Sequence, residues 1–404
     1  MKWHRILQKV LHITKCSGIL LSLTSAFYCH ANSAIEGYTS LNLSMFADDP
    51  TYSEQCCQHF NADIVMYPRY QYWHNNGVSV AISPYLRWDT QAETMFANIR
   101  EANIGYQGGQ QAFTFGISEV YWGVTEVYQP VNIVNQYDGR LALGYEDKMG
   151  QPMVHYQYWP TWGEVHLFLL PFHQIRTFRE PEQRLSLGKP VSNTAIYEAG
   201  KQALDVAARL TYWHDTLDIA FSLFQGNSRE PFLQETPTQY LQHYSNITQL
   251  GVEAQHSKDD LLLKLEATHK WGEGRPYTTL VTGFEYAFYG FTHSNGQIGL
   301  ITEYTFDNRQ TKTGNWVPPT IYNNDVFVGV RWQSNSVNDT EMLLSGLVDL
   351  EKNSQLYKLS ASRRLSNHLK LTVEGFWLAE MAATEPMAYL QQESYVEMAV
   401  EYYF

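Results

Sequence analysis

The sequence predicts an all-β fold: a transmembrane, antiparallel, up-and-down β-barrel of 18 strands, with 16 strands as the second choice. Two observations lead to this prediction. Runs of about ten residues alternate between apolar and polar side chains, and turn residues separate these runs. The composition agrees, because aromatic residues make up 14% of the chain and charged residues only 17%, below the level of about a quarter in soluble domains.

The first 34 residues have the pattern of a cleaved secretory signal peptide. Lys2, Arg5, Lys9 and Lys15 precede a short apolar run, and small residues follow it. The run is too short to span a bilayer. Removal of residues 1–34 takes away four basic residues and no acidic ones, so the net charge changes from −13 to −17. Residues 35–404 are then one acidic barrel domain, for which nucleic acid is not an expected partner.

The alternation is clear in LLLKLEATHKW, where Leu261, Leu263 and Leu265 share one face and Lys264 and Glu266 the other. The 18 candidate strands lie near residues 36–48, 62–73, 78–88, 94–106, 110–122, 150–158, 163–171, 204–213, 215–225, 246–258, 260–271, 275–290, 295–307, 321–333, 338–350, 353–364, 367–379 and 391–404.

The connections between these strands sort by length. If both chain ends are periplasmic, every connection from an even to an odd strand must be a short periplasmic turn. These connections read NNG, GGQ, PTWG, HD, KD, THSNG, NSVN and SN. The long ones, near 123–149, 172–203, 226–245, 308–320 and 380–390, all fall at the other end. This sorting favours a barrel over the alternative fold, a soluble secreted β-sandwich.

The same alternation assigns charged side chains to the lumen. An 18-strand barrel is too wide for its wall side chains alone to fill, so these charges either line an aqueous pore or pair across strands and hold a polar interior. The expected pore-lining charges are Arg69, Arg87, Arg209, Lys264, Lys270, Arg331, Lys358, Arg364, Lys370, Glu253, Glu266, Glu285, Glu303, Glu374, Glu397 and Glu401.

Two long loops are expected to fold inward and constrict the lumen. Loop 123–149 and its flanks mix aromatic and polar groups that suit sugars or other hydroxylated solutes, whereas loop 172–203 carries a local positive patch that favours anionic solutes. The alternative for either loop is an exposed surface loop or a lipopolysaccharide contact. The candidate constriction residues are Trp122, Glu126, Asn132, Asn135, Asp138, Arg140, Arg176, Arg179 and Arg184.

The C-terminal strand and the alternation along the mature chain resemble those of Gram-negative outer-membrane porins. The segment FTFGISEVYWGVTEVYQPVNIVNQYD also resembles part of the alginate-export porins, in which a strand with a Gly and a WG pair leads into a loop that ends like VNxxNxxD. Here these features fall at Gly116, Trp122, Gly123 and the run Val131, Asn132, Asn135 and Asp138. The resemblance implies a porin-like channel and leaves the solute open.

Motifs of other function classes are missing from the sequence. We find no HExxH motif, G-x-S-x-G elbow or Walker loop, and we expect no metal, no cofactor and no catalytic residue. His269, beside Trp271, is read as an interfacial residue. A plugged, energy-coupled transporter is disfavoured because the first strand follows the signal peptide directly. A structural or adhesion barrel and, less favoured, an outer-membrane hydrolase remain the alternative functions.

Two further features of the sequence are an adjacent pair of cysteines and the C-terminal strand. Cys56 and Cys57 are adjacent in the first long loop, and a vicinal disulfide, two free thiols and a soft-metal contact are all open. The chain ends in an alternating strand with Tyr402 and Phe404 on its apolar face. This ending resembles the C-terminal signal that the barrel-assembly machinery recognises.

The sequence therefore predicts a Gram-negative outer-membrane channel for passive or selective diffusion of small polar solutes. Its expected surroundings are membrane lipid and lipopolysaccharide, with the N- and C-termini on the periplasmic side. The sequence leaves the solute and the oligomeric state undetermined.

Overall fold

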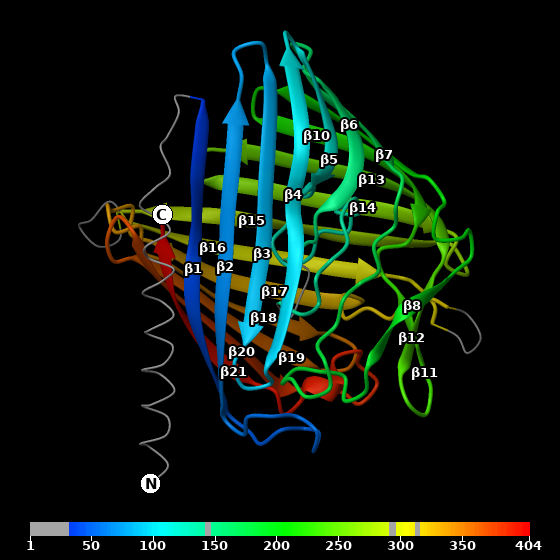
Figure 1. Cartoon of the computed structure of the whole chain (residues 1–404), viewed down its shortest axis with the longest axis vertical. Helices are drawn as coiled ribbons and strands as arrows, with labels where there is room; N and C mark the ends of the chain where they lie inside the picture. Colours follow the sequence, from blue (N-terminus) through cyan, green and yellow to red (C-terminus); the bar gives the residue numbers. More distant parts are fainter. Residues whose placement is uncertain (1–31, 142–146, 291–295, 312–315) are drawn as a thin grey trace.

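The computed structural model describes residues 32–141, 147–290, 296–311 and 316–404. Within these residues the main sheet contains 18 strands, and the first strand pairs with the last, so that the sheet closes into an antiparallel barrel (Figure 1). Closure satisfies the backbone hydrogen bonds of both edge strands, which an open sheet would leave exposed.

The barrel strands are β1 (Ser33–Phe46), β2 (Phe60–Trp73), β3 (Val78–Asp89), β4 (Thr94–Gly108), β5 (Gln111–Ser118), β6 (Gln151–Tyr158), β7 (Gly163–Leu170), β9 (Asp205–His214), β10 (Leu217–Asn227), β13 (Asn246–Lys258), β14 (Leu261–Trp271), β15 (Tyr277–Tyr289), β16 (Gln297–Asp307), β17 (Asn324–Gln333), β18 (Glu341–Asp349), β19 (Gln355–Arg364), β20 (Leu369–Glu380) and β21 (Tyr395–Tyr403). A second sheet contains β8 (Val191–Tyr197), β11 (Phe232–Glu235) and β12 (Tyr240–Tyr244), and a 3₁₀ turn, η2, covers Ala388–Leu390.

The predicted strand count of 18 is confirmed, and each predicted range overlaps one barrel strand. The two largest boundary errors are equal. The last strand was predicted to begin at residue 391 and β21 begins at Tyr395, and β5 was predicted to reach residue 122 and ends at Ser118. The chain leaves the sheet at Ser118 because the Asn135 side chain binds the backbone groups that would otherwise continue the strand. Its Nδ2 donates to Ser118 O, and its Oδ1 accepts from Val120 N.

The three-stranded sheet was not predicted. It lies at the loop end of the barrel (Figure 1), where β12 pairs with β11 in antiparallel and with β8 in parallel orientation. These strands belong to the connections 171–204 and 228–245, which the sequence reading treated as loops. They are short and carry no apolar alternation of the kind that marks the barrel strands.

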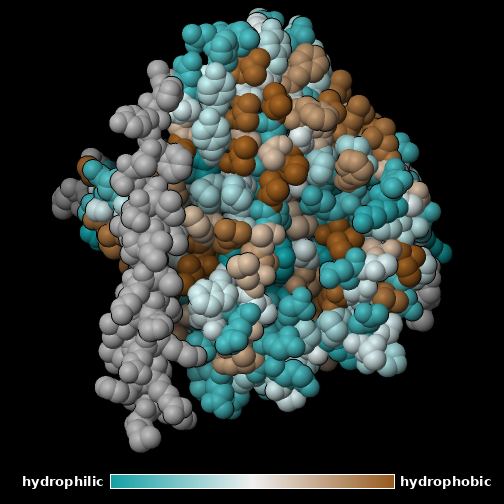
Figure 2. Space-filling model, in the orientation of Figure 1, coloured by the Kyte–Doolittle hydropathy of each residue, from teal (hydrophilic) through white to brown (hydrophobic). Residues whose placement is uncertain are grey.

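The outer face of the barrel is apolar. Exposed side chains such as Ile82, Ile99, Phe115 and Leu223 point outward from β3, β4, β5 and β10. Figure 2 shows hydrophobic residues gathered over the middle of the surface formed by β2–β4, with hydrophilic residues toward the loop end. Among the described residues, no helix is long and apolar enough to cross a membrane.

The buried core lies inside the barrel, where infolded loops meet the wall. Trp122 and Val131 of the β5–β6 connection pack against Met153, Phe168 and Phe224 of the wall. The expected signal peptide, residues 1–34, falls almost entirely outside the described residues, so its assignment stays a prediction.

Two-residue turns fix the register of the strands at the end of the barrel opposite the long loops. Asp215 and Asp259 adopt left-handed backbone conformations, with φ of 50° and 53°, in the two-residue connections 215–216 and 259–260. Such turns match the twist of paired strands. Within the sheet, Gly116 has φ of 129°, and a Cβ at this position would lie 2.3 Å from Ala102 O. Only glycine allows β4 and β5 to approach so closely there.

Candidate functional site

The β5–β6 connection, residues 119–150, crosses the interior of the barrel. Backbone N–H groups of the clamped segment, which we define as residues 123–127, donate to carboxylates of three wall strands. Glu253 of β13, Glu266 of β14 and Glu303 of β16 supply these carboxylates, and each is at most 2% exposed. A loop predicted to fold inward thus contacts wall residues predicted to face the lumen.

Asparagine side chains give this connection its internal shape. Asn132 Oδ1 accepts from Trp122 N at 3.0 Å and from the Lys148 ammonium. Asn135 Nδ2 donates to Ser118 O and Met149 O, at 2.9 and 2.8 Å. The two side chains link the start of the connection to its end, so they hold the shape of the loop.

The start of the β7–β9 connection, residues 171–190, packs beside the first loop. Asp138 Oδ1 accepts from Thr177 Oγ1 at 2.6 Å and from Arg140 Nε at 2.8 Å. Burial raises the pKa of Asp138, but hydrogen bonds from Arg140 and Thr177 outweigh it and leave the pKa below its ordinary value. The Arg140 guanidinium also lies over the ring of Phe96 at 4.0 Å.

Arg184 fastens the second loop to two other loops. Its Nε donates to Glu393 at 2.8 Å, and its other nitrogens donate to the carbonyl oxygens of Asp48, Cys57 and Gln58. Both Arg184 and Glu393 have side chains only 1% exposed. Arg184 was predicted to be a constriction residue, but it is absent from the described linings of both large cavities and instead positions the loop.

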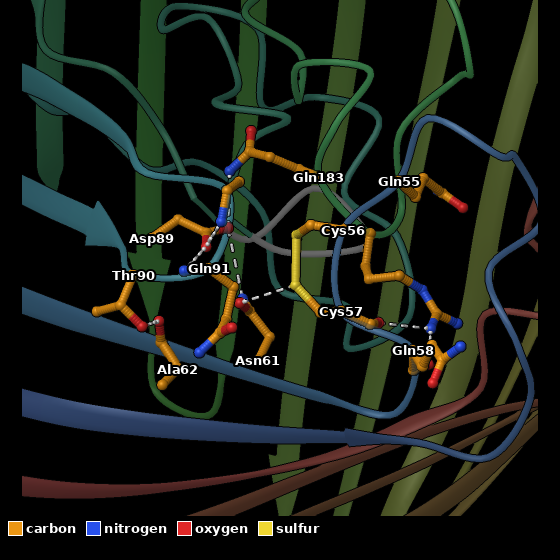
Figure 3. The surroundings of a disulfide bond; sticks show 12 residues. Gln55, Cys56, Cys57, Gln58, Asn61, Ala62, Asp89, Thr90, Gln91 and Gln183 are labelled. Atoms are coloured by element: carbon orange, nitrogen blue, oxygen red, sulfur yellow. Dashed lines mark hydrogen bonds between the residues drawn. A yellow bond between two sulfur atoms is a disulfide. The ribbon is translucent and has the colours of Figure 1, made fainter. Parts of the chain in front are cut away.

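Cys56 and Cys57 form a vicinal disulfide, which resolves the three options left by the sequence (Figure 3). Cys57 Sγ lies 3.7 Å from Asn61 Oδ1, and Cys56 N donates to Glu182 O at 2.7 Å. The disulfide therefore belongs to the group of loop contacts around Arg184.

Two cavities remain between the loops and the wall. The larger has a volume of about 490 Å³ and the smaller about 250 Å³. Four residues line both: Arg179, Leu185, Lys358 and Phe376. Arg179 Nη2 also donates to Leu141 O at 3.2 Å. The two cavities therefore share one wall region that carries two cationic side chains.

The walls of the two cavities differ in character. The larger is rich in aromatic and aliphatic groups, with Glu126, Arg176 and the two shared cations as its charged groups. The smaller carries more polar groups, among them Arg87, Asp147, Glu374 and Glu397. The apolar share of the larger cavity was not predicted, because its residues come from four separate connections and four strands that only the fold brings together.

Strand register places all 16 expected pore-lining charges on the inner face of the sheet. Many of them pair with each other or with neighbouring loops. Their ion pairs include Arg69–Glu101, Arg69–Glu36, Arg87–Asp63, Arg209–Glu253, Lys264–Glu285, Lys270–Glu273, Arg331–Glu285 and Arg331–Glu126.

The remaining inner charges lie along the last strands. Glu374 accepts from Ser360 at 2.6 Å and Glu397 from Ser44 at 2.8 Å. Lys370 and Glu401 are cross-strand neighbours, and Arg364 pairs in register with Lys370 near the short-turn end. Arg364, Lys370 and Glu401 lie toward the short-turn end of their strands. Lys358, in contrast, lines both cavities.

Sequence reasoning missed a histidine pair on the inner wall. His155 Nε2 lies 2.9 Å from His166 Nδ1, and His166 Nε2 lies 2.8 Å from Glu164. Strand alternation places each residue, but only the β6–β7 register brings them together. His269 lies on the outward face and contacts the ring of Trp271, as predicted. In the described part of the chain, no group of three or more His, Cys, Asp or Glu side chains is arranged to hold a metal.

Comparison with known proteins supports the fold. The sequence matches no protein-family model and no curated protein. Solved structures do match, including Acinetobacter baumannii OccAB1 with a TM-score of 0.56 and 8% identity, over 92% of this chain and 96% of that one. Pseudomonas aeruginosa OpdL matches with a TM-score of 0.54 and 9% identity, over 93% and 99% of the two chains.

A third structure, Pseudomonas aeruginosa OccK8 (OprE), matches with a TM-score of 0.53 and 11% identity, over 92% of this chain and 98% of that one. These proteins are outer-membrane porins, so the chain has a porin-type barrel fold. The comparisons give no support to the alginate-export part of the resemblance.

Proposed function

We propose that the protein is an outer-membrane channel that lets small polar solutes diffuse through the barrel. The observation that carries this proposal is the pair of cavities inside the barrel, of about 490 and 250 Å³, which share a wall region. The apolar outer face and the porin-type fold support a position in the membrane. In this arrangement the long loops lie outside the cell and both termini lie in the periplasm.

We further propose that the shared wall sets a preference for anionic solutes. Arg179 and Lys358 both line the two cavities. A cation in a narrow space with low-dielectric walls acts on a passing ion more strongly than it would in water. The acidic groups Glu374 and Glu397 line only the smaller cavity, so they act on a solute in that cavity alone.

The proposal includes the other expected partners. Lipopolysaccharide would contact the long loops, and the barrel-assembly machinery would recognise the C-terminal strand that ends at Phe404. Phe404 N donates to Gly37 O at 3.1 Å, so this residue also helps to close the barrel.

Single-channel recording in planar bilayers tests the proposal. We expect stepwise current from the refolded protein and a reversal potential that shows anion preference in a salt gradient. Arg179→Gln and Lys358→Gln should each shift that reversal potential toward cations, whereas the exposed loop variant Lys201→Gln should leave it unchanged.

Two results would contradict the proposal. Folded protein that gives no current would favour a structural or adhesion barrel, and turnover of lipid or peptide by that protein would favour the hydrolase alternative. Current with no shift in either variant would retain the channel and reject the role of Arg179 and Lys358.

A further inference from the structure

Three wall glutamates hold the clamped segment through its backbone N–H groups. One side chain adds to this hold, because Thr125 Oγ1 donates to Glu266 Oε1 at 2.6 Å. Gly123 N lies 3.1 Å from Glu253 Oε2. Val124 N and Thr125 N lie 2.7 and 2.8 Å from Glu266 Oε1. The next two N–H groups, of residues 126 and 127, both lie 2.8 Å from the Glu303 carboxylate. Five consecutive N–H groups thus donate to carboxylates of β13, β14 and β16.

This arrangement is strong for two physical reasons. A hydrogen bond to an ionised carboxylate is roughly twice as strong as one between neutral groups. Burial strengthens it further, since Glu266 is fully buried and Glu303 is 1% exposed, so water competes little. A loop without regular secondary structure gains from these carboxylates the backbone partners that a strand would have found in its neighbours.

The clamped segment also forms part of the larger cavity. Glu126 and Val127 line it, together with the next residue, Tyr128. Tyr128 stacks on Tyr322 with ring centroids 4.4 Å apart, and the Glu126 carboxylate lies 2.7 Å from Arg331. A displacement of the segment away from the wall would therefore change the width of the cavity.

We propose that Glu253, Glu266 and Glu303 are positioning residues that set the width of the channel by holding the backbone of residues 123–127 against the wall. Their ionised form makes the strong bonds, so acidification that neutralises them loosens the segment. The link to width rests on the proposed channel function, but the hold on the backbone does not.

Other charges face these glutamates from every neighbouring element. Arg209 of β9 binds Glu253 at 2.9 Å, and Lys264 of β14 lies near both Glu303 and Glu285. Arg331 of β17 binds Glu285 and Glu126. Glu253 and Glu266 are direct cross-strand neighbours. These cations retain carboxylate partners when Glu266 or Glu303 alone is neutralised.

The experiment removes acceptors and donors separately. Glu266→Gln and Glu303→Gln remove the acceptor charge, and Val127→Pro removes one donor, while Val127→Ala keeps that donor and trims only the side chain. Glu101→Gln is the matched control, because the Glu101 carboxylate lies on the inner wall and binds Arg69 instead of the clamped segment. Hydrogen exchange of peptides that contain residues 123–127 and single-channel conductance are measured for each variant.

We expect faster exchange and higher conductance in Glu266→Gln, Glu303→Gln and Val127→Pro, with Val127→Ala and Glu101→Gln unchanged. Wild-type conductance should rise on acidification, and Glu303→Gln should lose part of that rise. Unchanged exchange in all three variants would overturn the clamp. Faster exchange with unchanged conductance would overturn its role in channel width.

The design separates failure of the clamp from failure of the proposed function. A wild-type protein without current would reject the channel, while exchange would still decide whether the glutamates hold the segment. If Glu266→Gln fails to fold, Glu303→Gln and the matched Val127→Pro and Val127→Ala pair decide the question.

Discussion

Glu230 and Arg309 show how a single ion pair stabilises the long-loop end of the molecule. Their side chains lie 2.9 Å apart, and Arg309 also binds Asp307 at 2.8 Å. Burial alone would raise the pKa of Glu230, but Arg309, with Lys270 and Arg176, lowers it to about 2. The ionised form of Glu230 is therefore favoured by folding.

This pKa predicts a pH-dependent stability. The folded pKa lies below the ordinary value of 4.5, so the contribution is complete above about pH 4.5 and is lost as the pH falls toward about 2. We expect Glu230→Gln to lower the unfolding free energy at neutral pH by up to roughly 3 kcal/mol. The difference from wild type should vanish near pH 2 in denaturant unfolding. A difference that stays constant over this range would contradict the assignment.

Arg184 and Glu393 form a second buried pair with a different consequence. Removal of one partner from such a pair leaves an uncompensated buried charge, at a cost of about 3–5 kcal/mol. Arg184 also binds the backbone carbonyl oxygens of Gln58 in the β1–β2 connection and Gln392 in the β20–β21 connection. A deletion of the second loop must therefore be combined with a substitution that neutralises Glu393, because the deletion removes Arg184.

At the scale of elements, the two infolded connections divide the interior between them. The β5–β6 connection forms one side of the larger cavity, and Phe178, Arg179 and Leu185 of the β7–β9 connection form another. If the second connection narrows the channel, its loss should join the two cavities into one wider passage.

We predict that deletion of residues 172–189, combined with Glu393→Gln, raises single-channel conductance. The added substitution avoids leaving the Glu393 carboxylate buried without Arg184. Glu393→Gln alone in the full-length chain is the control. Equal conductance and ion preference in the deletion and its control would place the connection outside the conducting path.

At the scale of the whole molecule, the outer face sets how the barrel sits in lipid. Leu223 lies near the middle of β10 and is 42% exposed, while Leu217 begins the same strand beside a short turn. Both point outward, so a charge at either position tests the depth of that position in the membrane.

We predict that Leu223→Arg lowers the unfolding free energy by about 2–4 kcal/mol, whereas Leu217→Arg costs at most about 1 kcal/mol. A basic side chain at the bilayer midplane loses its hydration, and one near the interface does not. Unfolding titrations in lipid vesicles measure both variants. Equal effects at the two positions would contradict the proposed membrane placement.

The closing strand gives a second prediction at this scale. Tyr402 of β21 pairs with Thr39 of β1, and Phe404 directly follows the last strand residue, Tyr403. We predict that Phe404→Asp reduces insertion of the barrel into the outer membrane, while protein that does insert conducts normally. Heat-modifiable mobility in membrane fractions measures insertion. Normal insertion of the variant would reject the assembly role.

The sequence by itself determined the barrel. Period-two alternation is a local property of each strand, and the lengths of the connections are visible in the chain. These two features predicted the 18 strands and the inner face for Glu266, Glu303 and Lys358. The exact end of β5 escaped prediction, because it depends on bonds from Asn135, which lies 17 residues beyond Ser118.

Contacts between side chains that are far apart in the chain depend on the tertiary structure. Glu266 and Thr125 are 141 residues apart in the chain, and Arg184 and Glu393 are 209 apart. No local pattern encodes such distances, because closure of the sheet and the fold of the loops bring them together. The three-stranded sheet and the wall shared by the two cavities depend on long-range contacts of the same kind.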